Sequence, residues 1–166
     1  MRIESSRLAL ESLSLEELIN YEKDFKLDRD HIDISELIIS ETQRKAIRIK
    51  VEKMKDIDES IHEWYTYWLI INKFDYKALG LVGFKGIDDT GKVEIGYGIT
   101  PKYEGRGYMS EAVETLIKWA FSNEKCTAIT ATRVLKANIG SRKVLKKNGF
   151  KLIDEDEDTF NFILTK

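Results

Sequence analysis

The apolar positions of this chain follow two spacings, and each spacing predicts one kind of element. Strict alternation, or a run of β-branched and aromatic residues, is typical of a strand, whereas apolar residues at helical spacing indicate a helix. The predicted strands cover Arg7–Ser12, Trp64–Asn72, Lys77–Ile87, Lys92–Thr100, Thr127–Leu135, Phe150–Asp154 and Thr159–Thr165. The predicted helices cover Ser14–Lys23, a stretch within Ser35–Asp56, Tyr108–Ser122 and Asn138–Asn148.

These elements follow the order βααβββαβαββ along the chain. The middle strands have the short connections of an antiparallel meander, and a strand–helix–strand crossover comes after them. The sequence therefore predicts an α/β fold with a mixed, mostly antiparallel central sheet flanked by helices. No stretch has the composition of a linker, an internal repeat or a low-complexity tract, so we expect residues 1–166 to form one domain.

Composition and charge narrow the class of protein further. The 166 residues are 42% hydrophobic and 34% charged, a balance typical of a globular domain. The formal net charge of −2 provides no overall basic field, so we expect no nucleic-acid partner. Cys126 is the only cysteine, and His31 and His62 are the only histidines, so we expect neither an intramolecular disulfide nor a metal site.

Hydropathy also bears on location. The longest apolar run, near Trp68–Ile71, is far shorter than the roughly 20 residues that cross a bilayer. The first residues, MRIESSRLALES, lack the apolar core of a secretory signal. We therefore expect no membrane partner and a cytoplasmic location, in which Cys126 stays reduced.

The predicted strand Lys92–Thr100 has one apolar face and one nearly bare face. The apolar face consists of Val93, Ile95, Tyr97 and Ile99. Because side chains alternate along a strand, Glu94, Gly96 and Gly98 lie on the other face. Two alternating glycines weaken a strand and need a reason. A ligand along the bare backbone would supply one, and a helix packed tightly on this face would supply another; both interpretations stay open here.

A glycine-rich turn follows this strand and leads directly into a predicted helix. Its sequence is Glu104-Gly105-Arg106-Gly107-Tyr108-Met109. The first N–H groups of a helix have no partner within the helix, and the helix dipole adds partial positive charge there. Phosphate is the natural ligand of such a turn, and a glycine-rich connection without a ligand is the alternative. A dinucleotide fingerprint is disfavoured, because Ser110 stands where that motif has glycine.

A second cluster of informative residues lies one strand later, over Asn138–Phe150. Asn138 is suited to cap a helix, Gly149 is suited to end it, and the basic residues between them are suited to a solvated face. Together with the glycine turn and the element order, however, this cluster resembles the GNAT superfamily of amine N-acetyltransferases. It is most similar to the ribosomal-protein N-terminal (alanine) acetyltransferase-like branch, and the resemblance covers essentially the whole chain.

Two family motifs carry the resemblance. The acetyl-CoA motif, Gln/Arg-x-x-Gly-x-Gly/Ala, falls on Glu104–Met109 and is followed by Ser110-Glu111-Ala112. The second motif, Asn-x-x-Ser/Ala with a helix that ends in Gly-Phe, falls on Asn138–Phe150. Two positions depart from the pattern, because Glu104 replaces Gln or Arg and Met109 replaces Gly or Ala. These departures bear on the strength of cofactor binding rather than on the fold.

The resemblance implies a site for acetyl-CoA. The diphosphate would rest on the main-chain N–H groups of Gly105, Arg106, Gly107, Tyr108, Met109 and Ser110. The pantetheine arm would pair with main-chain groups of Gly98, Ile99 and Thr100, on a side that the alternating glycines leave open. Asn138 would contact the arm from the other side, and Arg142 or the nearby lysines would meet the 3′-phosphate.

The resemblance also implies direct transfer of an acetyl group to a primary amine, either a protein N-terminus or a small molecule. A protonated amine cannot attack, so a base is needed. Glu94 is the candidate base, and a surface carboxylate paired with a lysine is its ordinary alternative. Ser141 is the candidate proton donor to the departing thiolate, because Leu145 stands where many relatives have a tyrosine; Tyr108 and Tyr103 are the reserve donors. The sequence identifies no particular amine, and the family allows a homodimer.

Two other functions stay open from the sequence. One is a non-catalytic acetyl-CoA-binding or interaction module of the same fold, which the residues Glu104, Met109 and Leu145 favour. The other is an unrelated nucleotide-binding α/β protein, whose usual motif this chain lacks. Binding of acetyl-CoA and turnover with an amine are the observations that separate the three.

Overall fold

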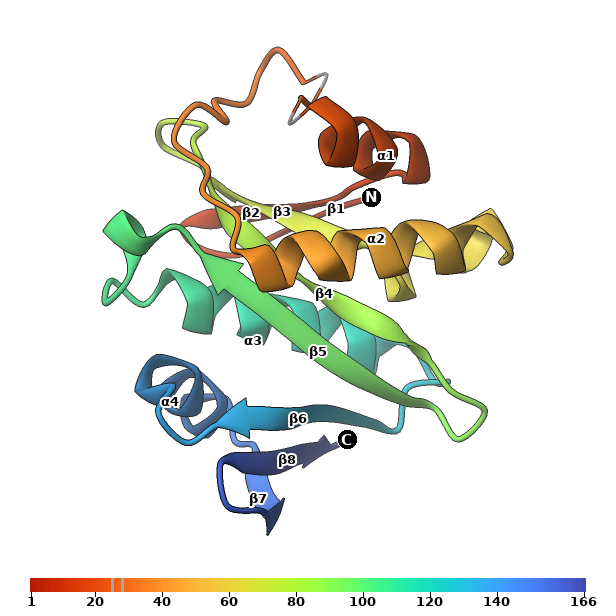
Figure 1. Cartoon of the computed structure of the whole chain (residues 1–166), viewed down its shortest axis with the longest axis vertical. Coiled ribbons are helices and arrows are strands. Elements are labelled where there is room, and N and C mark those ends of the chain that lie inside the picture. Colours follow the sequence, from red (N-terminus) through yellow and green to blue (C-terminus); the bar gives the residue numbers. More distant parts are fainter. Residues whose placement is uncertain (25, 28) are drawn as a thin grey trace.

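The computed structural model describes residues 1–24, 26–27 and 29–166 (Figure 1). Its helices are α1 (Leu15–Asp24), α2 (Glu41–Lys55), α3 (Tyr108–Ser122) and α4 (Ile139–Lys147), with 3-10 turns η1 (Glu59–Trp64) and η2 (Pro101–Tyr103). Its strands are β1 (Arg2–Glu4), β2 (Leu8–Ser12), β3 (Tyr67–Asn72), β4 (Ala78–Ile87), β5 (Lys92–Ile99), β6 (Ala128–Leu135), β7 (Lys151–Glu155) and β8 (Thr159–Thr165).

The strands form one mixed sheet in the order β1-β2-β3-β4-β5-β6-β8-β7. The pair β5–β6 is parallel, and α3 is the crossover that connects these two strands. The other neighbouring pairs are antiparallel. The predicted mixed, mostly antiparallel sheet flanked by helices is thus confirmed.

The pairing between β5 and β6 is short, and this shapes the rest of the molecule. It joins Lys92–Glu94 to Ala128–Thr130 and ends there. Beyond Glu94 the two strands run apart toward the end of the sheet where α4 lies (Figure 1). A sheet that opens in this way leaves one edge of β5 without a neighbouring strand.

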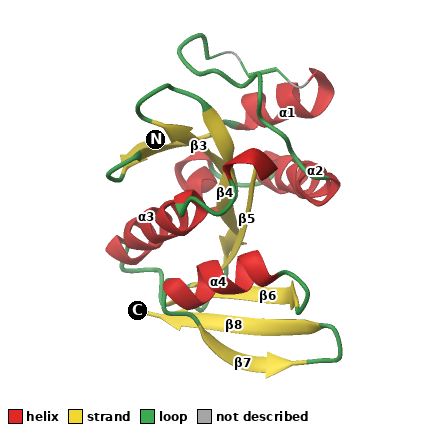
Figure 2. Cartoon of the chain, turned by 90° about the vertical axis from the view of Figure 1, so that its left-hand side faces the viewer, coloured by secondary structure: helices red, strands yellow, loops and turns green. Residues whose placement is uncertain are grey.

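Apolar side chains pack on both faces of the sheet. Helix α3 covers one face, and α1 and α2 cover the other (Figure 2). Adjacent residues of β3 illustrate the alternation, since Trp68 is buried in the cluster under α3 whereas Leu69 is buried in the cluster under α1 and α2. Strands β2, β3 and most of β4 are therefore buried on both faces, which explains their nearly continuous apolar runs in the sequence.

Several element boundaries differ from the sequence prediction for identifiable reasons. The strand predicted from Trp64 begins at Tyr67, because Trp64 lies in η1, whose first turn is capped by Asp58. The Trp64 ring packs at a tilt against Trp119, with ring centroids 4.5 Å apart. The helix within Ser35–Asp56 begins only at Glu41, where Ser40 and Gln43 form a capping box. Strand β1 was not predicted, because its three residues are too short for any periodicity to appear.

Candidate active site

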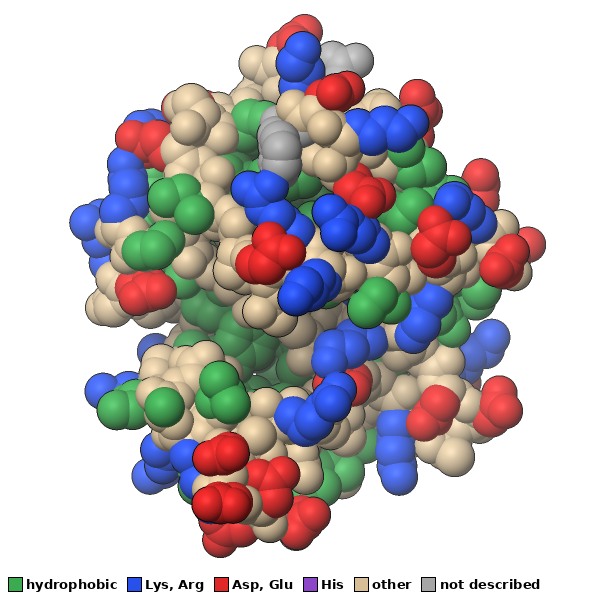
Figure 3. All heavy atoms as spheres, viewed as in Figure 1, with side chains coloured by type: hydrophobic (Ala, Val, Ile, Leu, Met, Phe, Trp, Pro, Cys, Tyr) green, Lys and Arg blue, Asp and Glu red, His purple; other side chains and the backbone are tan. Residues whose placement is uncertain are grey.

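A cleft of about 680 Å³ lies where β5 and β6 run apart. Its walls are the end of β5, the glycine turn, the start of α3 and the face of α4 toward them. Figure 3 shows the surface hollowed at this place, with hydrophobic side chains inside the hollow. The predicted site residues that line it are Gly98, Ile99, Gly105, Gly107, Tyr108, Met109, Ser110, Asn138 and Ser141. Two motifs that are distant in the sequence therefore meet at one cleft.

The glycine turn presents unpaired main-chain N–H groups. Gly105 and Gly107 have φ angles of +73° and +79°, the left-handed conformation that glycine adopts without strain. No side chain caps α3 at Gly107. Among the described residues, none accepts a hydrogen bond from the N–H groups of residues 105–110, whereas the next amide, of Glu111, donates to the Gly107 carbonyl. These free donors at a helix N-terminus are suited to bind an anion.

Ser141 contacts a tyrosine that the sequence analysis did not select. The hydroxyl of Tyr97 lies 2.9 Å from Ser141 Oγ, and it also reaches the Ser141 carbonyl at 3.3 Å. Burial raises the pKa of Tyr97 to about 12, so the phenol is protonated at neutral pH. The alternating pattern assigned Tyr97 to the apolar core face. A hydroxyl at the end of an apolar face, close to the glycine turn, was the only signal that could have marked it.

Asn138 acts as the cap of α4 and also faces the cleft. Its side-chain oxygen accepts a hydrogen bond from the Ser141 N–H at 3.0 Å. This is the ordinary capping role that the sequence offered for this residue. The amide nitrogen of Asn138 has no acceptor among the residues that the structure describes, so it is the atom that can contact a bound molecule.

The main-chain groups at the end of β5 differ from the expectation. Thr100 is fully buried, its N–H donates to the Leu79 carbonyl at 2.8 Å, and its hydroxyl accepts from the Ile38 N–H at 3.0 Å. Because hydrogen-bonding direction alternates along a strand, Gly98 also faces β4, whereas Tyr97 and Ile99 face the open edge. The geometry therefore moves the expected main-chain pairing from Gly98 and Thr100 to Tyr97 and Ile99.

The bare face of β5 has two different explanations. A Cβ at Gly98 would lie 2.6 Å from Gln43 Nε2, because α2 packs tightly there. At Gly96 the nearest atoms to such a Cβ are Lys85 Cε at 3.9 Å and the Tyr67 hydroxyl at 4.0 Å, which leaves room. The vacant groove expected beside both glycines is thus wrong at Gly98, where the helix-packing interpretation holds.

Glu94 lies on the Gly96 side of β5, outside the lining of the cleft. Its Oε1 accepts hydrogen bonds from Lys85 Nζ and, at 2.7 Å, from Thr132 Oγ1. The Glu94 side chain is 28% exposed. The structure does not bring Glu94 and Ser141 into contact, and the lysine-paired carboxylate of the ordinary alternative is what it shows.

Two basic residues take other positions than expected. Arg142 donates to the Lys136 carbonyl at 3.0 Å and stacks on Phe160 with its guanidinium carbon 4.9 Å from the ring centroid. Arg142 therefore does not line the cleft, whereas the lysines Lys143 and Lys147 do. Arg106, whose N–H belongs to the turn, is also absent from the lining.

The positions that depart from the family motifs fit the fold. Met109 is buried in the core and Leu145 is fully buried, so the apolar side chain of each packs inside the fold. Glu104 lines the cleft. The reserve donor Tyr103 also lines the cleft, but its hydroxyl donates to Glu36 at 2.5 Å. The hydrogen bonds from Lys102, Tyr103 and Lys77 lower the pKa of Glu36 to about 2.

The described residues also bear on a metal site and on a membrane-spanning helix. They contain no group of three or more His, Cys, Asp or Glu side chains arranged to hold a metal ion. Within the same part of the chain, no helix is both long enough and apolar enough to cross a membrane.

The sequence profile of the acetyltransferase (GNAT) domain matches residues 7–151, most of the chain and all of the cleft described above. This chain belongs to that family. The GNAT assignment confirms the family resemblance that the sequence indicated.

Individual relatives agree with the GNAT assignment. The chain is 42% identical over 89 residues to the uncharacterized N-acetyltransferase YjdG of Bacillus subtilis, which is 53% of this chain and 52% of that protein. The match thus spans about half the length of the curated relatives. The activity of those relatives is therefore not assigned to this chain by the match alone.

Solved structures of GNAT proteins share the fold. Ribosomal-protein-S5-alanine acetyltransferase of Vibrio fischeri matches with a TM-score of 0.68 and 21% identity, over 99% of this chain and 96% of that one. The N-acetyltransferase PseH of Campylobacter jejuni, solved in complex with acetyl coenzyme A, matches with a TM-score of 0.60 and 23% identity, over 96% of this chain and 99% of that one. At these identities the likeness concerns the fold.

Proposed function

We propose that this GNAT protein is an acetyl-CoA-dependent N-acetyltransferase that transfers an acetyl group directly to a primary amine. The family supports the reaction class. The single observation that carries the cofactor assignment is the row of unpaired N–H groups over residues 105–110 at the N-terminus of α3. Such a row suits a diphosphate, which is the anionic part of coenzyme A.

The cleft offers a position to each part of acetyl-CoA. The diphosphate is bound by the free amides of the turn. The pantetheine arm extends the sheet along the open edge of β5, where Tyr97 and Ile99 direct their main-chain groups, and Asn138 meets it from α4. Lys143 and Lys147 supply positive charge for the nucleotide 3′-phosphate in place of Arg142.

The chemistry requires an attacking amine and a leaving thiolate. The neutral amine nitrogen attacks the thioester carbonyl, the C–S bond breaks, and the sulfur leaves as a thiolate. Ser141, hydrogen-bonded to Tyr97 beside the arm, donates a hydrogen bond to that sulfur. Glu94 takes the amine proton through water, on the side of β5 where Gly96 leaves room.

A non-catalytic acetyl-CoA-binding module is the second candidate. It is favoured by the position of Glu94, which is held by Lys85 and Thr132 outside the cleft, and by the buried Leu145 at the position of the usual tyrosine. The cytoplasmic location and the homodimer stay predictions, and the identity of the acceptor amine is left to a panel of amines.

Two measurements test the proposal. Acetyl-CoA at about a hundred times its Kd stabilises the folded state by ~2.7 kcal/mol and raises the Tm by roughly 5–10 °C for a domain of this size. A thiol-release assay then follows turnover over a panel of peptides with free N-termini, polyamines and small amines. No change in Tm at millimolar acetyl-CoA contradicts the proposal, whereas binding of acetyl-CoA without release of its thiol in the presence of any amine of the panel supports the non-catalytic module.

A further inference from the structure

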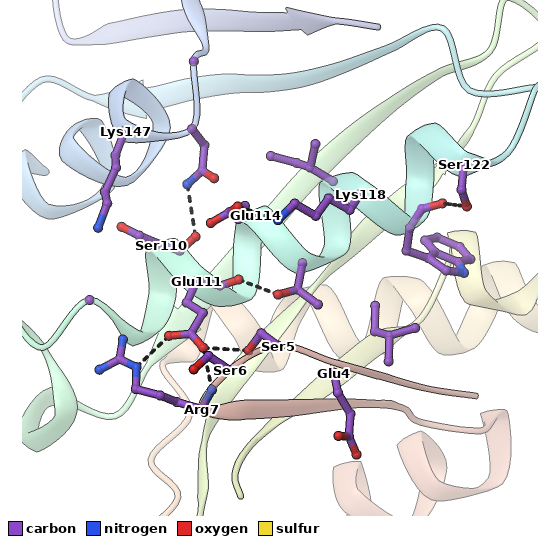
Figure 4. A pocket seen from close by; sticks show the side chains of 17 residues that line it. Glu4, Ser5, Ser6, Arg7, Ser110, Glu111, Glu114, Lys118, Ser122 and Lys147 are labelled. Carbon is purple, nitrogen blue, oxygen red and sulfur yellow. Dashed lines mark hydrogen bonds and ion pairs between the residues drawn. The ribbon is translucent and has the colours of Figure 1, made fainter.

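Arg7 links the start of β2 to the glycine turn, although about a hundred positions separate them in the sequence. Figure 4 shows its side chain reaching from the β1–β2 connection to Glu111 in the first turn of α3. The guanidinium has a second set of contacts on the turn itself. The family motifs give neither the Arg7 nor the Glu111 side chain a role in binding the cofactor.

Glu111 fixes the position of Arg7 from one side. Its Oε1 accepts from Ser5 Oγ at 2.7 Å and from the Arg7 main-chain N–H at 2.8 Å, and its Oε2 accepts from Arg7 Nε at 2.7 Å. Burial opposes ionisation of this carboxyl, but the hydrogen bonds from Ser5 and Arg7 outweigh it and lower the pKa of Glu111. A carboxylate in the first turn of a helix is also favoured by the helix dipole. Arg7 is therefore held at both its backbone and its side chain.

The other side of the guanidinium holds the turn. Arg7 Nη1 donates to the Arg106 carbonyl at 3.1 Å, and the guanidinium carbon lies 4.5 Å from the ring centroid of Tyr108. In a trans peptide the C=O and the following N–H point in opposite directions. A fixed Arg106 carbonyl thus directs the Gly107 N–H away from Arg7. Gly107 lines both the cleft and the groove on the outer side of α3 in which Arg7 lies.

We propose that Arg7, held by Glu111, is a positioning residue for the diphosphate seat, because it fixes the peptide between Arg106 and Gly107 and the ring of Tyr108. This inference rests on the proposed function and goes beyond it. It places a determinant of acetyl-CoA affinity in the segment before β2. The ordinary alternative is an ion pair that ties β2 to α3 and has no specific effect on the ligand.

A pair of ligands separates these two roles. Coenzyme A contains the diphosphate, whereas S-acetylpantetheine contains the arm and the thioester without it. In the variants Arg7→Met and Glu111→Gln, the Kd for coenzyme A, measured by calorimetry, should rise about tenfold, the effect of losing roughly one charge-assisted hydrogen bond. The Kd for S-acetylpantetheine, measured by NMR titration, should stay within about twofold of the wild-type value.

Conservative and control variants complete the test. Arg7→Lys keeps the charge but cannot reach Glu111 and the Arg106 carbonyl together, so its Kd for coenzyme A should lie between those of the wild type and Arg7→Met. Lys118→Met removes the exposed pair with Glu114, 2.6 Å apart on the same helix, and should leave both affinities unchanged. Arg7→Lys and Glu111→Gln also serve as the milder variants if Arg7→Met fails to fold.

The outcomes are distinct for the two proposals. A wild-type protein that binds no coenzyme A contradicts the proposed function itself. A wild-type protein that binds it, with an unchanged Kd in the Arg7 and Glu111 variants, contradicts only the positioning role. Equal loss of affinity for coenzyme A and S-acetylpantetheine, together with a lower Tm, also contradicts it and supports the ordinary ion pair.

Discussion

The hydroxyl of Tyr97 lies 2.9 Å from the hydroxyl of Ser141, and this contact joins the open edge of β5 to the first turn of α4. Because the Ser141 N–H donates to Asn138, the serine is held on two sides. A hydroxyl fixed in this way is suited to stabilise a charge that develops at one place in the cleft, since no reorganisation is needed during the reaction.

Removing the Ser141 hydroxyl should therefore slow turnover more than it weakens cofactor binding. We expect Ser141→Ala to lower kcat about a hundredfold, and Tyr97→Phe to lower it about tenfold through loss of one hydrogen bond. Steady-state kinetics with acetyl-CoA and the amine found by the panel measure both values. Ser122→Ala, at the far end of α3, is the matched serine control. A rise in KM with kcat unchanged would assign Ser141 to binding alone.

The contact between Tyr97 and Ser141 also predicts how the effect of Tyr97→Phe on kcat depends on pH. The raised pKa of Tyr97, about 12, means that its phenol is protonated at every pH well below 12 and deprotonates only above it. The ratio of wild-type kcat to that of Tyr97→Phe should therefore stay constant from about pH 6 to pH 10. A ratio that falls with an apparent pKa inside this range would show that the Tyr97 hydroxyl itself titrates there, which contradicts the pKa raised by burial.

Glu94 is the residue on which the enzyme and the binding module differ most. If it takes the proton of the amine, Glu94→Gln should lower kcat near neutral pH about a hundredfold while the Kd for acetyl-CoA stays within about twofold. Glu114→Gln, which removes an exposed carboxylate of α3, is the control. An unchanged kcat in Glu94→Gln would show that the hydrogen bonds with Lys85 and Thr132 have only a structural role.

The two glycines on the bare face of β5 should respond differently to alanine. A Cβ at Gly98 forces Gln43 to move, and Gln43 Oε1 accepts from the Ser40 N–H in the capping box of α2, so Gly98→Ala should cost about 1 kcal/mol of unfolding free energy. Gly96→Ala meets nothing closer than 3.9 Å and should change stability by less than about 0.5 kcal/mol. Urea denaturation measures both. Equal effects would contradict the packing of α2 on Gly98.

Local signals in the sequence were enough to predict the fold and to indicate the glycine turn and the cap of α4. The glycine turn at Gly105 and Gly107 and the cap at Asn138 depend on residues within a few positions of each, so composition and spacing indicated them. The crossover between β5 and β6 followed from the order of elements.

The errors at Thr100, Gly98 and Arg142 share one cause, which is a partner distant in sequence. Thr100 is committed to Leu79 and Ile38, and Gly98 is covered by Gln43. Arg142 turns to Phe160 at the start of β8. No pattern local to these residues contains the partner, so the sequence could propose their roles but could not choose between them.

The central claim is that the unpaired amides of residues 105–110 bind the diphosphate of acetyl-CoA. Two-dimensional NMR of the ¹⁵N-labelled protein tests it most directly, because each of these N–H groups gives its own signal. The account predicts that coenzyme A shifts the signals of Gly105–Ser110 most strongly, and that S-acetylpantetheine shifts those of Tyr97 and Ile99 while leaving the turn in place. Unchanged signals over Gly105–Ser110 at saturating coenzyme A would contradict it.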